Sequence, residues 1–258
     1  MPSAGMICNS GGVIFYNPLN NIDGMISIVY NNTDDHVVIR GENKFMPAKI
    51  FEELSEEKRR RIIAACITEF SEYGYTGSST NRMIRNAGIS KGSLFQYFRN
   101  KEELYFYVLD CVIQELTEYL EPGSKALPEE LFDKIIKYAE LEFSWYIRNP
   151  EKGRLIIDAS AGKDTAICQK VEERYRLKGQ DIYDSLLEDI DVSMFRGDKQ
   201  KTADILKWFL KGFNEDFNTR ISPQEDMDFS SLQHDYVKSL SDYMELLKSG
   251  ILTGEKER

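Results

Sequence analysis

The fold of this chain is decided by the stretch AGISKGSLFQYFRNKEEL, residues 87–104. Gly88 interrupts an apolar helical pattern, because a glycine readily adopts the left-handed conformation that ends a helix. Ser90 follows, a residue type that caps helix N-termini, and it is expected to begin a helix from Lys91 to Phe98. Asn100, with Lys-Glu-Glu behind it, is expected to cap the next and longer helix.

Two further helices are expected before this stretch. Apolar residues recur at helical spacing over residues 62–70, and Ser55 with two glutamates behind it is expected to cap that helix. Gly74 is expected to end it with a left-handed cap. A Thr-Gly-Ser-Ser turn at 76–79 then provides the cap of a short helix that ends at Ala87.

The two short helices on either side of Gly88 have the dimensions of a helix-turn-helix. Their apolar faces can pack on the stripe of the first helix, which leaves the start of the helix at 91–98 exposed. Many three-helix proteins contain such a turn without binding DNA, so the architecture alone leaves the function open. The residues expected on the exposed side are Lys91, Gly92, Ser93, Phe95, Gln96 and Tyr97.

Charge is distributed unevenly along the chain. The net charge is −10, yet residues 49–101 carry ten basic and six acidic side chains, a net of +4. The residues before this segment have a net charge of −2, and those after it −12. A basic module joined to an acidic body indicates a chain of which one part meets nucleic acid. An ordinary solvated helix surface is the alternative, and charge alone does not decide between them.

Composition excludes several classes of protein. With 41% hydrophobic and 29% charged residues the chain has a globular composition, and no apolar run reaches the roughly 18 residues of a membrane span. The N-terminus lacks the features of a secretory signal, so we expect a cytoplasmic protein. Neither a disulfide framework nor a metal site is expected, because the candidate ligands are scattered: Cys8, Cys66, Cys111, Cys168, His36 and His234.

The segment 87–104, with Gly74-Tyr75 before it, strongly resembles the DNA-binding domain of the tetracycline-repressor (TetR) family. That family's signature runs approximately G-[FY], then A-G-V-S-K-G-x-[LF]-Y-x-Y-F-x-x-K-E-x-L. The resemblance covers about 55 residues, from Phe51 to roughly Leu109. It implies an all-α fold, with an N-terminal three-helix DNA-binding domain that contains the helix-turn-helix and a larger helical domain for ligand binding and dimerisation. The recognition helix that enters the major groove would be residues 91–98.

The resemblance also implies which residues contact DNA. Gln96 is suited to a bidentate contact with adenine, and Tyr97 would place its hydroxyl on a phosphate. Phe95 stands where the family more often has Tyr. Arg82 or Arg85 would add charge, whereas the basic run at 58–61 is more often a solvated face. The implied DNA-binding residues are Ser79, Asn81, Lys91, Gly92, Ser93, Phe95, Gln96, Tyr97 and Lys101.

Three parts are expected along the chain. Residues 1–45, rich in Asn and Gly with a short β-like run at 25–30, are expected to be a leader or a poorly ordered extension. Residues 46–104 would form the DNA-binding domain and residues 105–258 the helical effector-binding and dimerisation domain. After the helix that ends at about Leu120 we expect a hinge-like break over 121–128. Helices are then expected over 129–148, 151–161, about 164–189, 199–218 and 230–250.

The helical body carries two expected surfaces. The resemblance implies that its last two helices form a dimer interface. Aromatic residues of the body would line an effector pocket, ordinary core being the alternative. Glu140, Glu142 and Asp158 would select a cationic ligand in such a pocket, but they are expected on the surface. The pocket residues are Phe143, Trp145, Tyr146 and Trp208, and the interface residues are Phe209, Phe213, Tyr236, Leu240, Tyr243 and Leu247.

These observations predict a one-component transcriptional regulator, a repressor that binds a pseudo-palindromic DNA operator as a homodimer and is released by a small-molecule effector. One alternative is an architectural or cell-division DNA-binding protein of the same fold without an effector. A helical protein–protein adaptor is another. An enzyme is not expected, because the sequence has no catalytic motif, no phosphate-binding glycine loop and no usable metal cluster. No cofactor, metal or membrane partner is expected.

Overall fold

The computed structural model describes residues 27–28, 39–40, 47–161, 166–175, 198–221 and 228–251. The chain divides into two units, Met1–Met46 and Pro47–Arg258. In the first unit, strand β1 (Ser27–Ile28) pairs antiparallel with β2 (Ile39–Arg40), and β1 falls in the run that was expected to be β-like. His36 and Cys8 lie outside the described residues.

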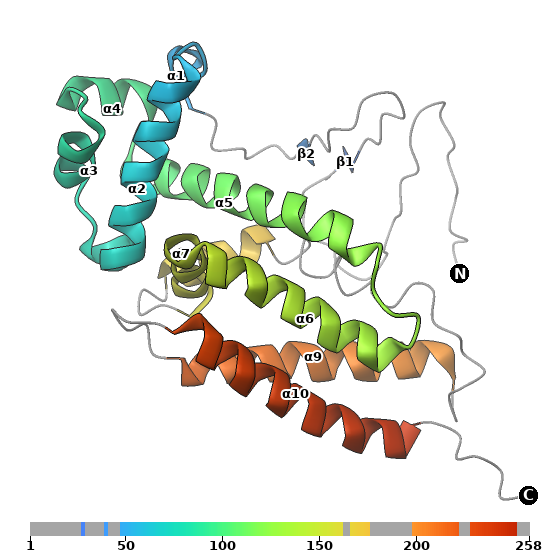
Figure 1. Cartoon of the computed structure of the whole chain (residues 1–258). Coiled ribbons are helices and arrows are strands. Elements are labelled where there is room, and N and C mark those ends of the chain that lie inside the picture. The colour runs from blue at the N-terminus through green and yellow to red at the C-terminus, as the bar shows by residue number, and fades with distance from the viewer. Residues whose placement is uncertain are drawn as a thin grey trace, which may run out of the picture. The chain divides into compact units, whose positions relative to one another are not determined.

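The described residues of the second unit are helical (Figure 1). The prediction of an all-α fold, with a helix-turn-helix at its start and a larger helical part behind it, is confirmed. Of the long helix expected over 164–189, residues 166–175 are described, and these are helical. The elements are α1 (Lys49–Glu52), α2 (Glu56–Gly77), α3 (Thr80–Ala87), α4 (Lys91–Tyr97), α5 (Lys101–Ser124), α6 (Leu131–Arg148), α7 (Pro150–Ala161), α9 (Lys199–Arg220) and α10 (Phe229–Ile251).

Three helices begin at the caps that the sequence predicts. The side chains of Ser55, Ser90 and Asn100 each accept a hydrogen bond from the backbone N–H three residues on, at 3.4, 3.2 and 2.8 Å. At α5 the Glu103 carboxylate reaches back and accepts a hydrogen bond from the Arg99 backbone N–H at 2.7 Å. This reciprocal cap satisfies two donors that a helix N-terminus otherwise leaves unpaired.

Two helix ends differ from the prediction. Gly74 has the expected positive φ of 64°, but with ψ at 179° it breaks the geometry of α2 without a left-handed cap, and the helix resumes as far as Gly77. Helix α5 continues beyond Leu120 to Ser124 and includes Pro122, so half of the expected hinge is helical. Proline has no N–H to donate within the helix, and α5 ends two residues later.

The helix-turn-helix part is built on one apolar core. Its helices α2 to α5 share a set of side chains that are at most 2% exposed. Helix α1 closes this core with Phe51, whose ring centroid lies 5.3 Å from that of Tyr97 and 5.0 Å from that of Phe98. The side chains of this set include Phe51, Ile62, Cys66, Phe70, Met83, Leu94, Leu104 and Tyr105.

A buried carboxylate joins α2 to α3. Glu69 is 2% exposed and accepts hydrogen bonds from the Ser79 backbone N–H at 2.6 Å and from Arg82 Nε at 2.8 Å. The Arg82 guanidinium also donates to the Gly77 carbonyl at 2.9 Å and lies 4.0 Å from the centroid of the Tyr73 ring. One acidic group therefore compensates the positive end of α3 and an arginine of its first turn.

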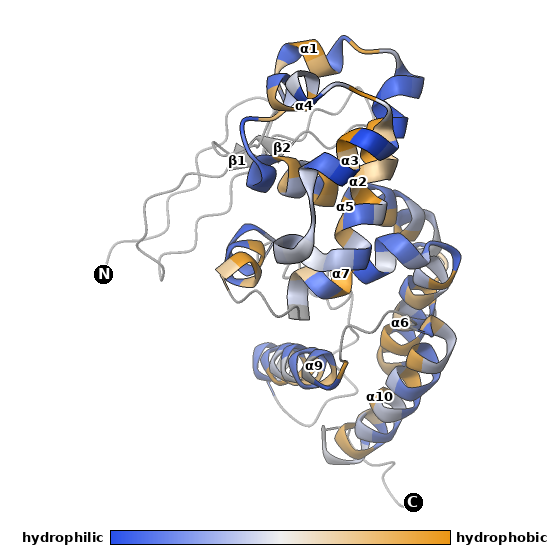
Figure 2. Ribbon diagram, turned by 90° about the vertical axis from the view of Figure 1, so that its left-hand side faces the viewer, coloured by the Kyte–Doolittle hydropathy of each residue, from blue (hydrophilic) through white to orange (hydrophobic). Residues whose placement is uncertain are grey.

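The larger helical part packs α6, α9 and α10 around a second core. Helices α6 and α10 run side by side in both views (Figures 1 and 2). Their inward side chains, with those of α9, form a cluster that is at most 6% exposed. In the described part of the chain, no helix is long and apolar enough to cross a bilayer. The cluster is Leu131, Phe132, Ile135, Ala139, Leu206, Leu210, Phe213, Leu240 and Met244.

Helix α7 connects the two parts, since it packs against α2 on one side and against α6 on another. Thr68 of α2 donates a hydrogen bond to Glu151 of α7 at 3.2 Å. A carboxylate oxygen of Asp158 lies 3.1 Å from the point where a Cβ on Gly74 would stand. The α2 backbone at the kink is therefore in close contact with helix α7 of the helical body.

Replacing Glu69 by Gln is expected to lower the free energy of unfolding by about 2 kcal/mol, because the buried side chain loses charge-assisted hydrogen bonds to Ser79 and Arg82. Glu56→Gln is the matched control. It removes an ion pair with Arg60 on the same helix, but that pair is exposed, so a loss of less than about 0.5 kcal/mol is expected. Urea unfolding followed by circular dichroism measures both, and equal losses would contradict the role given to Glu69.

Candidate nucleic-acid interface

The turn between α3 and α4 sets the direction of α4. Gly88, where a helix break is predicted, has φ 62° and ψ 40°, a left-handed conformation, and the Ile89 N–H donates to the Ile84 carbonyl at 3.2 Å. Helix α4 then starts at Lys91 and packs through Leu94, which is 2% exposed. The opposite side of α4 is therefore turned away from the core.

The outward side of α4 offers three different kinds of side-chain contact. Lys91, Gly92 and Gln96 are exposed, and Phe95 keeps 47% of its surface exposed. In the described part of the chain, neither Lys91 nor Gln96 has an ion-pair or side-chain hydrogen-bond partner. A cation, an amide and an apolar ring on one short helix are the groups that read guanine, adenine and the thymine methyl in a major groove.

Gly92 is not required by the fold. Its φ is not positive, and no atom lies within 4 Å of the place where a Cβ would stand. A glycine in a helix lowers the stability of the fold relative to alanine. No contact within the protein explains why a glycine stands here. Its open side faces outward, where a missing side chain lets another molecule approach the α4 backbone closely.

Tyr97 does not lie on the exposed side, and the prediction that it does is wrong. The residue is 5% exposed, its ring packs against Phe51, and its carbonyl accepts a hydrogen bond from the Ala48 N–H at 2.9 Å. It follows Leu94 by three positions and so shares the inward side of α4. Helix α1 covers it, and nothing in the motif itself predicts that cover.

Other residues expected at DNA are used inside the protein. The Lys101 ammonium donates to the Ser78 carbonyl at 2.9 Å and lies 4.9 Å from the centroid of the Tyr75 ring, so it holds the end of α2 against the start of α5. Arg82 is committed to the buried Glu69. The Ser93 hydroxyl lies 2.7 Å from that of the capping Ser90.

The basic run at 58–61 also has internal partners. Arg59 donates to the Glu52 carbonyl at 2.6 Å, Arg61 donates to the Ala87 carbonyl at 2.9 Å, and Arg60 forms an ion pair with Glu56. These contacts tie α2 to α1 and to the end of α3. The run therefore stabilises the domain through at least three of its four side chains.

Three exposed cations of the domain have neither an ion pair nor a side-chain hydrogen bond in the described part of the chain: Arg85, Lys91 and Arg99. Arg85 shares one side of α3 with the exposed Asn81, four residues earlier. Arg99 follows the end of α4 and was missed as a site residue. Its signal in the sequence is a basic residue directly after the Tyr-Phe pair of the motif. These side chains are the cations available to phosphates.

The residues expected to line an effector pocket separate into two places. Phe143, Trp145 and Tyr146 of α6 are 6%, 4% and 6% exposed, and their rings are in contact. Trp208 of α9 is 72% exposed, so the prediction that it joins them is wrong. Glu142, expected on the surface, has a carboxylate that burial desolvates.

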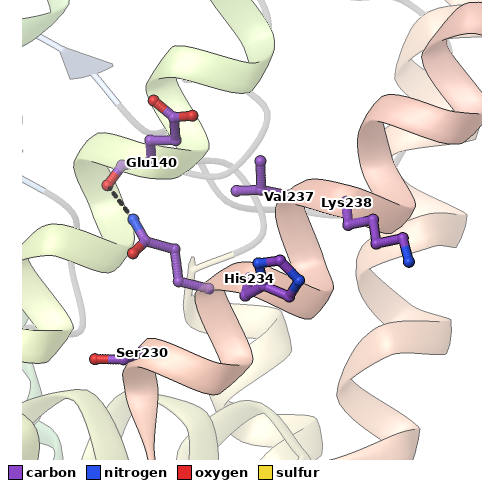
Figure 3. Close-up of a pocket in the computed structure, with 6 residues that line it drawn as sticks. Glu140, Ser230, His234, Val237 and Lys238 are labelled. Carbon is purple, nitrogen blue, oxygen red and sulfur yellow. Dashed lines mark hydrogen bonds between the residues drawn. The ribbon is translucent and has the colours of Figure 1, made fainter.

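A hollow of about 580 Å³ lies between α6 and α10 (Figure 3). Glu140 borders it from α6, and Ser230, His234 and Lys238 border it from α10. Gln233 spans the two helices by donating a hydrogen bond to the Glu140 carbonyl at 3.2 Å. The charges around this hollow are mixed, and it opens to solvent, so it does not have the apolar lining of the expected pocket.

The expected dimer residues are also divided. Phe213 and Leu240 are 6% and 1% exposed in the core of their own subunit, so the prediction that they form the outer surface is wrong. Phe209, Tyr236 and Leu247 pack against that core from its edge. Tyr243 is half exposed. The large apolar side chains that α9 and α10 expose are Ile205, Trp208, Tyr243 and Leu246.

The cysteines offer no reactive site in the described part of the chain. Burial, with a smaller contribution from the charge of Glu69, raises the pKa of Cys66 to about 12, so its thiol stays protonated. Cys111 and Cys168 are partly buried, and neither forms a disulfide with another described cysteine. No group of three potential metal ligands occurs among the described residues.

Known proteins share this helix-turn-helix. Residues 62–108 match the model of a family described as bacterial regulatory proteins, tetR family. The chain is 38% identical over 72 residues to the HTH-type transcriptional regulator HbdR of Aromatoleum sp. (strain CIB). This match covers 26% of this chain and 31% of HbdR.

The chain is also 27% identical over 102 residues to the nucleoid occlusion factor SlmA of Glaesserella parasuis serovar 5 (strain SH0165). This second match covers 39% of this chain and 50% of SlmA.

The whole helical arrangement also has a solved counterpart. The crystal structure of a transcriptional regulator from Cytophaga hutchinsonii ATCC 33406 matches 77% of this chain and 100% of its own, with a TM-score of 0.56 and 20% identity. At that identity the match shows the fold. The matches in sequence span half or less of the length of the two curated relatives.

Gly92→Ala is expected to raise the free energy of unfolding by about 0.5–1 kcal/mol while it weakens DNA binding, because the new methyl group stands between the α4 backbone and the groove. Gly88→Ala is the contrast. Its Cβ would also meet nothing within 4 Å, but φ is 62°, so a loss of about 1 kcal/mol is expected. Thermal melts and fluorescence anisotropy with DNA measure the two effects, and a destabilised Gly92→Ala protein would refute the assignment.

Proposed function

We propose that this chain, which belongs to the TetR family of transcriptional regulators, is a one-component repressor that binds a pseudo-palindromic operator as a homodimer and releases it when a small molecule binds. Its helix-turn-helix is that of a DNA-binding protein, and the family is one of regulators rather than enzymes. One observation carries the proposal: the outward side of α4 holds exposed side chains that no other part of the described protein uses.

DNA recognition is assigned to α3 and α4. Lys91 and Gln96 would reach base edges, and Phe95, without a hydroxyl, would contact a thymine methyl instead of a phosphate. Arg85 and Arg99 would neutralise phosphates beside them. Of the nine residues that the resemblance implies, Tyr97 and Lys101 would act indirectly, by holding α4 and α5 in position.

The homodimer is assigned to α9 and α10. On α9, Ile205 and Trp208 stand three residues apart, and Gly212 follows one turn later with nothing within 4 Å of a Cβ position. On α10, Leu246 and Gly250 repeat this spacing. Apolar side chains beside open glycines let two helices of a second copy approach closely, and burial in a dimer removes the exposed apolar surface from water.

Effector control would act through the contacts that join the body to the DNA-binding part. Residues 166–175 hold α5 by two ion pairs, Lys170 with Glu102 at 2.6 Å and Arg174 with Asp110 at 2.5 Å. Helix α7 holds α2. An effector that prefers one arrangement of these helices changes the separation of the two recognition helices, which must be about 34–36 Å to engage adjacent major grooves. The site of action would be the cytoplasm.

A second candidate function is supported by the likeness to SlmA, which is named a nucleoid occlusion factor. A protein of that kind would occupy many sites along the chromosome and need no effector. Genome-wide occupancy separates the two functions, since a repressor is confined to promoters. The likeness to HbdR, named a transcriptional regulator, favours the repressor. So does the desolvated carboxylate of Glu142 in the helical body, because it is a candidate anchor for an effector.

Selection of DNA from a random pool by the full chain is expected to enrich a pseudo-palindrome. Gln96→Ala should relax the base preference at one position of each half-site, with a loss of about 1–3 kcal/mol per site. Gln114→Ala, an exposed glutamine of α5, is the matched control and should bind like the parent protein. With three available cations in each subunit, the logarithm of the affinity should fall by about 5 for each tenfold rise in salt. Failure to enrich any sequence would refute the regulator.

Trp208→Glu and Leu246→Glu are each expected to convert the dimer to monomers, because a desolvated carboxylate in an apolar interface has no partner. Ile147→Glu is the control, since Ile147 is an exposed apolar residue of α6, at 39%, outside the proposed interface. Analytical ultracentrifugation measures the mass of each variant. A parent protein that is monomeric, or a dimer that tolerates both glutamates, would show that α9 and α10 do not form the interface.

A further inference from the structure

We propose that the helical body contains a binding site for an organic cation, with the carboxylate of Glu142 and the hydroxyl of Tyr146 as its polar anchor. The inference rests on the proposed effector control and names the chemical class of the effector. Four features of the structure carry it: the side of α6 on which Glu142 stands, its single partner, the rings around that partner, and the contrast with other acids of the protein.

Glu142 stands on the inward side of α6. It follows Ile135 by seven residues, two turns of the helix, and Ile135 is 4% exposed in the core of the body. Glu140 stands on a different side, where it forms an ion pair with Lys137 at 2.7 Å and borders the solvent-filled hollow. Both glutamates are partly exposed, but they differ in their partners, because Glu140 is paired with a lysine and Glu142 is not paired with any cation of the described residues.

Among the described residues, the Glu142 carboxylate has one partner. Tyr146, one turn further along α6, donates its hydroxyl to the carboxylate at 2.5 Å. Burial raises the pKa of Glu142, and the hydrogen bond from Tyr146 opposes that change. In the described part of the chain, no lysine, arginine or histidine comes within ion-pair distance of it. A carboxylate accepts about four hydrogen bonds, so most of its capacity is unused.

Four other acids of this protein are matched with cations. Each of them holds a lysine or arginine from another helix or segment, which compensates its charge. Glu142 has no such cation among the described residues, and it lies beside the residues that the family resemblance implies for an effector pocket. The matched pairs are Glu69 with Arg82, Glu102 with Lys170, Asp110 with Arg174 and Glu115 with Lys152.

Aromatic rings surround the anchor. The centroid of the Tyr146 ring lies 5.7 Å from that of Phe143, 5.8 Å from that of Trp145 and 5.8 Å from that of Phe229 on α10. Burial, the charge of Glu142 and the hydrogen bond to Glu142 raise the pKa of Tyr146, and the charges of Tyr138 and Tyr236 make smaller contributions. The hydroxyl therefore stays protonated and remains a donor to Glu142.

This combination selects a positive charge. An amine or amidine donates to the open lone pairs of the carboxylate in charge-assisted hydrogen bonds, and the faces of the rings attract the same cation. A neutral ligand would leave the buried charge unmatched, and an anionic ligand would add repulsion to it. The unmatched carboxylate lowers the stability of the empty protein, and a cationic ligand removes that cost when it binds.

The test compares charged probes with neutral isosteres on the full chain. The pairs are benzamidine with benzamide, and phenethylamine with 2-phenylethanol, and benzoate serves as an anionic probe. Tryptophan fluorescence reports binding, because Trp145 contacts the Tyr146 ring and the chain has only two tryptophans. Trp208, the other one, is replaced by Phe in the reporter protein. The cation of each pair is expected to bind about tenfold tighter than its neutral partner.

Glu142→Gln should abolish that preference, and Glu140→Gln, the matched control, should keep it. Without ligand, Glu142→Gln should melt at the same temperature as the parent or higher, whereas a purely structural glutamate would lose stability when replaced. Equal binding of cations and neutral probes, binding of neither, or a destabilised Glu142→Gln protein would overturn the inference. If the parent protein binds no operator DNA, that result would instead contradict the proposed regulatory function, and the cation site would be unaffected.

Discussion

The arrangement of the DNA-binding part depends on the buried ion pair between Glu69 of α2 and Arg82 of α3. A carboxylate that is 2% exposed needs its partners, and here they are a guanidinium and the backbone N–H of Ser79 at the start of α3. The same interaction therefore fixes where α3 begins and how it lies on α2. Because Gly88 then sets the turn to α4, the direction of the recognition helix follows from a contact in which α4 takes no part.

The distribution of charge shows how a basic module reserves few cations for its partner. Arg59, Arg60, Arg61 and Arg82 all bind acceptors within the domain, as does Lys101. Long side chains that cross from one helix to the next are an economical way to hold a small domain whose core is limited. The positive charge that a sequence displays is thus larger than the charge that remains for phosphates.

The two halves of the protein are joined by helices that pack against both of them. Helix α7 packs against α2 and α6, and residues 166–175 are ion-paired to α5, the helix that begins directly after the recognition helix. Glu142 lies on α6, the neighbour of α7. A ligand that alters the packing of α6 is therefore two helix contacts away from α2, and its differential affinity for two arrangements sets the size of the response.

The sequence by itself determined the helix caps at Ser55, Ser90 and Asn100, the turn at Gly88 and the all-α fold, because these depend on local hydrogen bonds and backbone angles that residue type controls. The resemblance of 87–104 located the helix-turn-helix. Only the tertiary structure decided what covers each helix face. Helical periodicity separates an apolar side from a polar one but does not say which element packs on it, so the burial of Tyr97 beneath α1, the exposure of Trp208 and the inward position of Glu142 could not be predicted.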